Sequence, residues 1–192
     1  MNQFSPEIVL IAASTGGPAA FEALMPEIRR DFPVPILIVQ HITAYFTEIF
    51  AQRLDQISRI NVKLAEDGET VSAGTVYVAP SGKHMKLNSG NRICFEHSPL
   101  VVGVRPAADV LFESVADNFK GRRVLAVVLT GMGRDGKNGV AKLKEKKECF
   151  CIAQSERTCI VYGMPRAVAE CGMADKIMDL NDIAPGIESF KY

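Results

Sequence analysis

Short runs of aliphatic and β-branched residues alternate with helical patterns along most of this chain. Runs at residues 7–13 (EIVLIAA), 36–40 (ILIVQ) and 124–130 (VLAVVLT) predict strands that are buried on both faces. A helical spacing of apolar residues follows each of the three runs. Strands that alternate with helices favour an α/β fold, here a doubly wound, mostly parallel sheet with helices on both faces.

Proline and threonine mark the expected limits of the first two helices. Pro26 should kink or end the helix predicted over residues 18–28. Thr43 is expected to cap the next helix. The predicted core stripe of that second helix is Phe46, Ile49, Phe50, Leu54 and Ile57. Later in the chain we expect helices over residues 106–118, 136–146 and 165–172, and strands over residues 149–154 and 176–179.

The middle of the chain has a different pattern. Four short, partly alternating runs at residues 61–66, 75–79, 83–88 and 92–96 are separated by turns that contain glycine. They predict short strands and hairpins, so we expect a short antiparallel β insertion in the middle of the chain. No linker, repeat or shift of composition divides the sequence, and a single domain over residues 1–192 is expected.

Composition excludes several classes of function. The 22 basic and 22 acidic residues balance, so no global charge attracts nucleic acid. The longest apolar run, residues 8–13, is far shorter than the roughly 18 residues of a membrane span, and no signal peptide is recognisable. The five cysteines are an odd number without a CxxC pair, which favours buried thiols in a reducing compartment over a metal site. We therefore expect a cytoplasmic protein that does not insert into a membrane.

Polar residues follow three of the predicted buried strands. Ser14, His41 and Asp135 each come shortly after a strand, and ligands of open parallel sheets bind at the carboxyl ends of the strands. A hydroxyl, an imidazole and a carboxylate are the groups that nucleophilic acyl transfer requires. Gly16 and Gly17 would let a substrate approach the backbone, whose N–H groups at a helix start could hold an oxyanion.

Each of these residues also has a structural interpretation. Ser14 could be a helix N-cap, which is the commoner role, and Asp135 could simply stabilise a turn. His84 and His97 are alternative bases, although each is expected to be a surface or strand histidine.

The segment from Gly131 to Gly136 supports a rival hypothesis. It matches G-x-G-x-x-G, it lies between a strand and a helix, and Glu156 follows 20 residues later. It could therefore serve a non-catalytic nucleotide- or receptor-binding α/β module. Against this, the carboxylate of Asp135 would compete with a pyrophosphate for the helix start, and the motif normally follows the first strand of its unit.

At these residues the sequence resembles the catalytic domain of the CheB family, the bacterial chemoreceptor protein-glutamate methylesterases. The matching segments run nearly from end to end: residues 11–18 (IAASTGGP), 40–41 (QH), 65–68 (AEDG), 77–85 (YVAPSGKHM), 105–112 (RPAADVLF), 129–136 (LTGMGRDG) and 163–166 (GMPR). Two departures are Ala12, where the family commonly has glycine, and Val102-Gly103-Val104, which lacks the polar character often seen there.

The resemblance implies a serine hydrolase with a catalytic triad of Ser14, His41 and Asp135. It implies that Thr15 and Met132 lie at the site, where together with Gly16 they would contact the oxyanion or the substrate. The implied substrates are glutamate methyl esters on the cytoplasmic helices of methyl-accepting chemotaxis receptors, with deamidation of receptor glutamines as a second activity. No cofactor or metal is implied. Family members usually carry a receiver domain, which is not recognisable in residues 1–192 and could act in cis or in trans.

Overall fold

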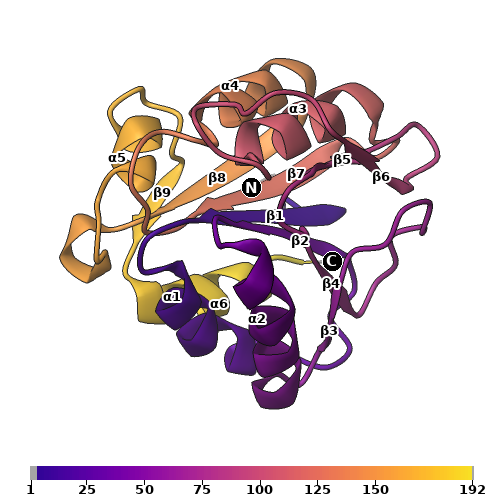
Figure 1. The fold of residues 1–192 in the computed structure, drawn as a ribbon. Helices are drawn as coiled ribbons and strands as arrows, with labels where there is room; N and C mark the ends of the chain where they lie inside the picture. Colours follow the sequence, from indigo (N-terminus) through magenta and orange to yellow (C-terminus); the bar gives the residue numbers. More distant parts are fainter. Residues whose placement is uncertain (1–3, 192) are drawn as a thin grey trace.

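The computed structural model describes residues 4–191, and its centre is a seven-stranded sheet in the order β3-β4-β2-β1-β7-β8-β9. Every neighbouring pair in this sheet is parallel, which confirms the predicted doubly wound sheet (Figure 1). The strands are β1 (Ile8–Ala13), β2 (Ile36–Gln40), β3 (Asn61–Leu64), β4 (Thr75–Val78), β7 (Arg123–Val128), β8 (Glu148–Gln154) and β9 (Lys176–Met178).

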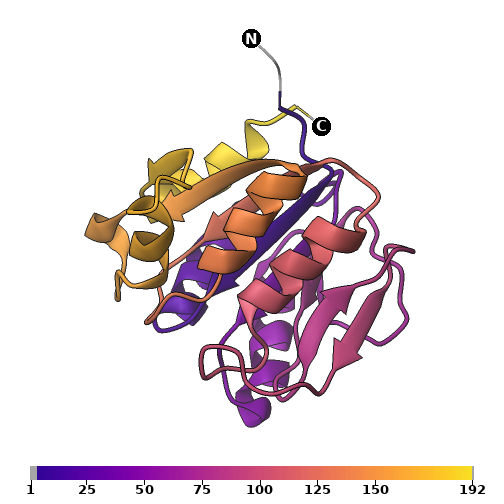
Figure 2. The same cartoon turned by 90° about the horizontal axis from the view of Figure 1, so that it is seen from above.

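Helices cover both faces of the sheet. One face carries α1 (Gly17–Leu24), α2 (Ala44–Ile57) and α6 (Leu180–Glu188), and the other carries α3 (Ala108–Asn118), α4 (Lys137–Lys146) and α5 (Met164–Ala169) (Figure 1). Seen from above, α3 and α4 lie side by side (Figure 2). Two 3₁₀ turns, η1 (Met25–Glu27) and η2 (Glu156–Thr158), complete the elements. α1 ends before Pro26 as predicted, whereas α6 was not anticipated.

Residues of β1 alternate between two buried clusters. Val9, Ile11 and Ala13 pack under α1 and α2, while Ile8, Leu10 and Ala12 pack under α3 and α4. All six are fully buried, as expected for a central parallel strand. Within residues 4–191, no helix combines the length and the apolar composition that crossing a bilayer requires.

The middle of the chain differs in part from its prediction. Only β5 (His84–Leu87) and β6 (Ile93–Glu96) form an antiparallel hairpin, whereas β3 and β4 lie parallel at the edge of the main sheet. The expectation of hairpins over residues 61–79 was therefore wrong. Gly68 and Gly74 have positive φ, as in a tight turn, but they lie in a longer connection that returns the chain to the same end of the sheet.

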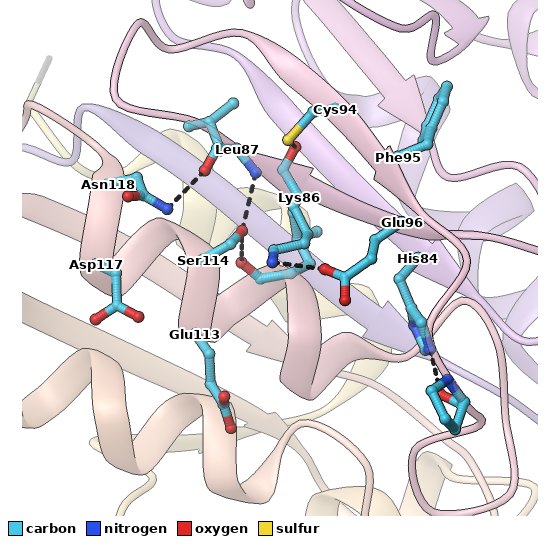
Figure 3. Close-up of polar contacts among 12 residues, drawn as sticks. His84, Lys86, Leu87, Cys94, Phe95, Glu96, Glu113, Ser114, Asp117 and Asn118 are labelled. Carbon is cyan, nitrogen blue, oxygen red and sulfur yellow. Dashed lines mark hydrogen bonds and ion pairs between the residues drawn. The ribbon is translucent and has the colours of Figure 1, made fainter.

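The β5–β6 hairpin is attached to α3 through side chains (Figure 3). Leu87 N donates to Ser114 Oγ at 2.9 Å, and Asn118 Nδ2 donates to Leu87 O at 3.0 Å. At the other end of β5, Ala107 N donates to Nδ1 of the buried His84 at 3.1 Å. His84 Nε2 lies 3.1 Å from Pro99 O and donates to it. The hairpin thus fixes the start of α3.

The buried face of α2 differs from the predicted stripe. Thr47, Phe50, Ala51 and Leu54 are buried, with Thr47 Oγ1 donating to Thr43 O at 3.0 Å. Phe46 and Ile49 are instead 51% and 49% exposed. The buried positions follow the i, i+3, i+4, i+7 spacing that begins at Thr47, so Phe46 and Ile49 lie on the flank of the helix.

Phenylalanine truncations on α2 test this assignment. Phe50 packs edge-on against Phe21 with ring centroids 5.6 Å apart, and we expect Phe50→Ala to lower the free energy of unfolding by about 3 kcal/mol. Phe46→Ala is the matched control and should cost less than about 1 kcal/mol. Urea unfolding of both variants measures the difference, and equal losses would contradict the observed face.

Candidate active site

The sheet reverses its strand order between β1 and β7. From β1 the chain builds toward β2, β4 and β3 on one side, and later toward β7, β8 and β9 on the other. Ala13 pairs with Gln40 in register, so Ser14 and His41 directly follow paired residues of adjacent strands. The loop that carries Asp135 follows β7, the neighbour on the other side of β1. Ser14, His41 and this loop therefore lie at one edge of the sheet, at the position where such folds bind ligands.

His41 and Asp135 form a direct hydrogen bond. His41 Nε2 lies 2.8 Å from Asp135 Oδ2, and the two side chains are 10% and 3% exposed. Because a carboxylate accepts, Nε2 carries the proton in the neutral ring, and Nδ1 keeps its lone pair. The pair therefore leaves one ring nitrogen that can take up a proton.

The start of α3 holds the Asp135 carboxylate. Ala108 N donates to Oδ2 at 2.6 Å, and Asp109 N donates to Oδ1 at 2.9 Å. The N-cap of α3 is Ala107, whose side chain cannot accept a hydrogen bond, so Asp135 provides the cap from another segment. The positive end of the helix also favours negative charge at this point.

Asp109 is a second buried carboxyl group beside Asp135. Its Oδ1 accepts from Gly139 N at 2.8 Å, while its buried Oδ2 has no hydrogen-bond partner among residues 4–191. Burial, together with the charge of Asp135, raises the pKa of Asp109 from 3.8 to about 6.

Ser14 lies in the turn between β1 and α1. Its carbonyl oxygen accepts from Gly17 N at 2.8 Å and from Gln40 Nε2 at 3.0 Å. The N-cap of α1 is Gly16, and no side chain caps this helix within residues 4–191, so the interpretation of Ser14 as an N-cap was wrong. Gly16 has φ +84°, and a Cβ there would lie 2.7 Å from Ile160 Cβ, which explains the need for glycine.

Three backbone N–H groups beside Ser14 remain available. Within the described part of the chain, the N–H groups of Thr15, Gly16 and Met132 donate no hydrogen bond. Thr15 is exposed, and Met132 is 75% exposed. Unpaired N–H groups of this kind can bind an oxyanion.

Three buried polar residues that the sequence analysis missed hold the backbone around the candidate site by hydrogen bonds. Gln40 Nε2 donates to the carbonyl oxygens of both Ser14 and His41 at 3.0 Å. Thr130 Oγ1 donates to Thr15 O at 3.0 Å and accepts from Ile160 N at 3.1 Å, while Thr130 N donates to Gln154 Oε1 at 2.8 Å. Gln40, Thr130 and Gln154 all lie in or just after predicted strands, so their polarity within apolar runs was the available signal.

The other candidate side chains lie outside this arrangement. His84 is the buried strand residue described above, and His97 is exposed. Burial raises the pKa of the Cys149 thiol to about 12 and that of Cys159 to about 11, and Cys151 is raised further, so these thiols stay protonated. Among residues 4–191, no three His, Cys, Asp or Glu side chains are grouped to hold a metal ion.

The environment of the loop from Gly131 to Gly136 argues against nucleotide binding. Asp135 Oδ1 accepts from Gly136 N at 3.0 Å, and Asp109 accepts from Gly139 N, so carboxylates already occupy the start of α4. A Cβ at Gly131 would lie 2.9 Å from Ser14 Cβ. Close packing against Ser14, rather than a pyrophosphate, therefore explains this glycine.

Two cavities flank the site. One of about 400 Å³ is lined by residues that include His41, Leu100 and Pro106. The other, of about 550 Å³, is lined by residues that include Val102, Arg134 and Arg166. The segment around Leu100 and Val102 borders both cavities, and these two side chains are 59% and 46% exposed.

Comparison with known proteins gives one consistent family. The family model described as CheB methylesterase matches residues 9–187. Two similar curated proteins are named protein-glutamate methylesterase/protein-glutamine glutaminase. The Nitratidesulfovibrio vulgaris protein, whose name carries the number 2, is 45% identical, and the match covers 97% of this chain and 51% of the relative. The Symbiobacterium thermophilum protein is 47% identical, and the match covers 94% of this chain and 49% of the relative. The chain therefore spans about half the length of these relatives.

The fold comparison agrees with the sequence comparison. The crystal structure of the Thermotoga maritima CheB methylesterase catalytic domain superposes with a TM-score of 0.89 at 40% identity. The match covers 95% of this chain and 97% of that one.

The raised pKa of Asp109 predicts a pH-dependent stability. Because the folded protein holds this proton more tightly than the unfolded chain, stability is lost as the pH rises from about 4 to 6. Asp109→Asn removes this penalty. The free energy of unfolding of the variant, relative to that of the parent protein, should therefore be about 2 kcal/mol higher at pH 8 than at pH 4. Urea unfolding at the two pH values measures the gain.

Asp117→Asn is a control of opposite sign on the same helix. Hydrogen bonds from Lys142 and Lys146 lower the pKa of Asp117, so its contribution to stability is present at pH 8 and lost in acid. A pH-independent difference between Asp109→Asn and the parent protein would contradict the raised pKa.

Proposed function

The chain belongs to the CheB methylesterase family, and from this membership we propose that it hydrolyses glutamate methyl esters on chemoreceptor proteins. Deamidation of glutamines on the same proteins is the proposed second activity. The observation that carries the proposal is the 2.8 Å hydrogen bond between His41 and Asp135, one strand away from Ser14. An imidazole oriented in this way, at the end of the strand that pairs with the strand of Ser14, supports the function of a serine hydrolase.

In the proposed reaction, Ser14 Oγ attacks the ester carbonyl carbon while His41 Nδ1 takes its proton. The C–O bond to the methoxy group then breaks, and His41 returns the proton to release methanol. Water hydrolyses the acyl-enzyme through the same base and frees the glutamate carboxylate. Asp135 fixes the ring tautomer and stabilises the imidazolium that forms in each half of the reaction. No step requires a cofactor.

The available N–H groups give this chemistry its oxyanion site. We assign the N–H groups of Thr15, Gly16 and Met132 to the tetrahedral intermediate, because none of them donates elsewhere within residues 4–191. In deamidation the leaving group is ammonia instead of methanol, and the same groups serve.

Exposed apolar side chains support docking of a receptor helix in the cytoplasm. Tyr45 and Phe46 lie in the first turn of α2, which follows His41, and they are 76% and 51% exposed. Met132 lies in the loop of Asp135, and Leu100 borders the cavity that His41 lines. An apolar rim of this kind suits the cytoplasmic helices of a chemotaxis receptor, or a receiver domain in cis or in trans.

Substitution of the three proposed catalytic residues tests the function. We expect Ser14→Ala, His41→Ala and Asp135→Asn each to reduce methanol release from methylated receptor by about a thousandfold or more. The double variant Ser14→Ala/His41→Ala should be hardly worse than either single variant, because the residues act as a unit. A serine-reactive phosphonate should label the parent protein at Ser14, as peptide mapping would show.

His97→Ala is the matched control for the base, since His97 is an exposed histidine. It should retain nearly full activity with an unchanged fold. A loss as large as that of His41→Ala would refute the assignment of His41.

The apolar rim predicts an effect on receptor binding. We expect Leu100→Ser to raise the KM for methylated receptor several-fold, while hydrolysis of a small soluble ester changes little, because only a large substrate contacts the rim. Ile177→Ser, at a 57% exposed residue on the edge strand β9, should leave both parameters unchanged. Equal effects of the two substitutions would argue against docking at this rim.

A further inference from the structure

Two carboxyl groups cross between α3 and α4. Asp135, which lies just before α4, accepts hydrogen bonds from the first N–H groups of α3. Asp109, in the first turn of α3, accepts from Gly139 N in the first turn of α4. The N-cap residues of the two helices are Ala107 and Gly136, and neither has a side chain that accepts. Asp135, which precedes α4, therefore caps α3, and Asp109 of α3 caps α4.

We propose that Asp109 is a positioning residue of the esterase reaction. By holding the start of α4 against α3, it keeps the loop before α4 at the place where Asp135 bonds His41. The inference rests on the proposed function, because the loop matters to activity only if Asp135 orients a catalytic base.

The close contact between the helices makes this coupling stiff. A Cβ at Gly139 would lie 2.5 Å from Phe112 Cβ and 3.1 Å from Asp109 Cα, so no side chain separates the two backbones here. Only residues 136–138 stand between Asp135 and Gly139. A shift of Gly139 away from Asp109 is thus transmitted to Asp135 over a very short length of chain.

The environment of Asp109 is unfavourable for stability. One buried carboxyl oxygen has no partner among residues 4–191, and the neighbouring Asp135 is a second acid. An asparagine would cap Gly139 N equally well without these costs. Stability therefore does not explain Asp109, and its contribution is the hydrogen bond that it accepts from Gly139 N, which holds α4 against α3.

Kinetics of Asp109 variants test the proposal. We expect Asp109→Ala to lower kcat for methanol release by about 10- to 100-fold with KM within about twofold, because a misplaced Asp135 affects the chemical step. Asp109→Asn keeps an acceptor for Gly139 N and should restore kcat to within about threefold of the parent value.

Asp117→Ala is the matched control. Asp117 lies on α3 (Figure 3) and joins the same two helices at their other end, through Lys142 and Lys146 at 2.7 Å each. It should leave kcat unchanged. If Asp109→Ala does not fold, Asp109→Ser takes its place, since the shorter side chain falls short of Gly139 N, and the same loss of kcat is expected.

A spectroscopic measurement separates this proposal from the proposed function. The N–H proton shared between His41 and Asp135 should give a far-downfield ¹H NMR signal that is absent from His41→Ala. It should persist in Asp109→Asn and Asp117→Ala and be lost or broadened in Asp109→Ala. A folded Asp109→Ala protein with the signal and kcat of the parent protein would overturn the proposal, as would an equal loss in Asp109→Asn. A parent protein that releases no methanol yet shows the expected signals would refute only the esterase function.

Discussion

The carboxylate of Asp135 connects the candidate active site to the rest of the fold. It accepts hydrogen bonds from His41, from the start of α3 and from its own loop, and it is almost fully buried. A buried carboxylate with several donors has one well-defined orientation, which an exposed loop acid would lack. The orientation of the imidazole therefore depends on where α3 begins, and any element that places α3 also places His41.

This dependence explains how the β5–β6 hairpin in the middle of the chain contributes to the candidate site. The β5–β6 hairpin is separate from the main sheet, yet it binds α3 through Ser114 and Asn118 and fixes Ala107 through His84. His84 was a rival candidate for the base, and its buried position shows a different role. His84 holds Ala107, the residue that precedes α3. It thus supports the candidate site although it lies outside that site.

Local pattern predicted the parallel sheet, most element limits and the edge at which Ser14, His41 and Asp135 lie, because strand ends in such folds converge by topology. Their catalytic roles remain predictions. The contributions of Asp109, Thr130 and Gln154 were missed, since each depends on a partner distant in sequence. The parallel pairing of β3 with β4 and the exposure of Phe46 were missed for a related reason: turn residues and apolar spacing are local signals, whereas strand direction and helix facing are decided by packing.

The exposed turn at the tip of the β5–β6 hairpin, where Asn91 has φ +56°, divides the site between two halves of the chain. Ser14 and His41 belong to the half before the tip, and Asp135 with both of its supporting helices belongs to the half after it. The halves meet along the parallel pairing of β1 with β7 and across the hairpin itself. A chain opened at this tip would keep Ser14 and His41 together in one fragment and Asp135 in the other, so the proposed hydrolysis would report directly on reassembly of the two fragments.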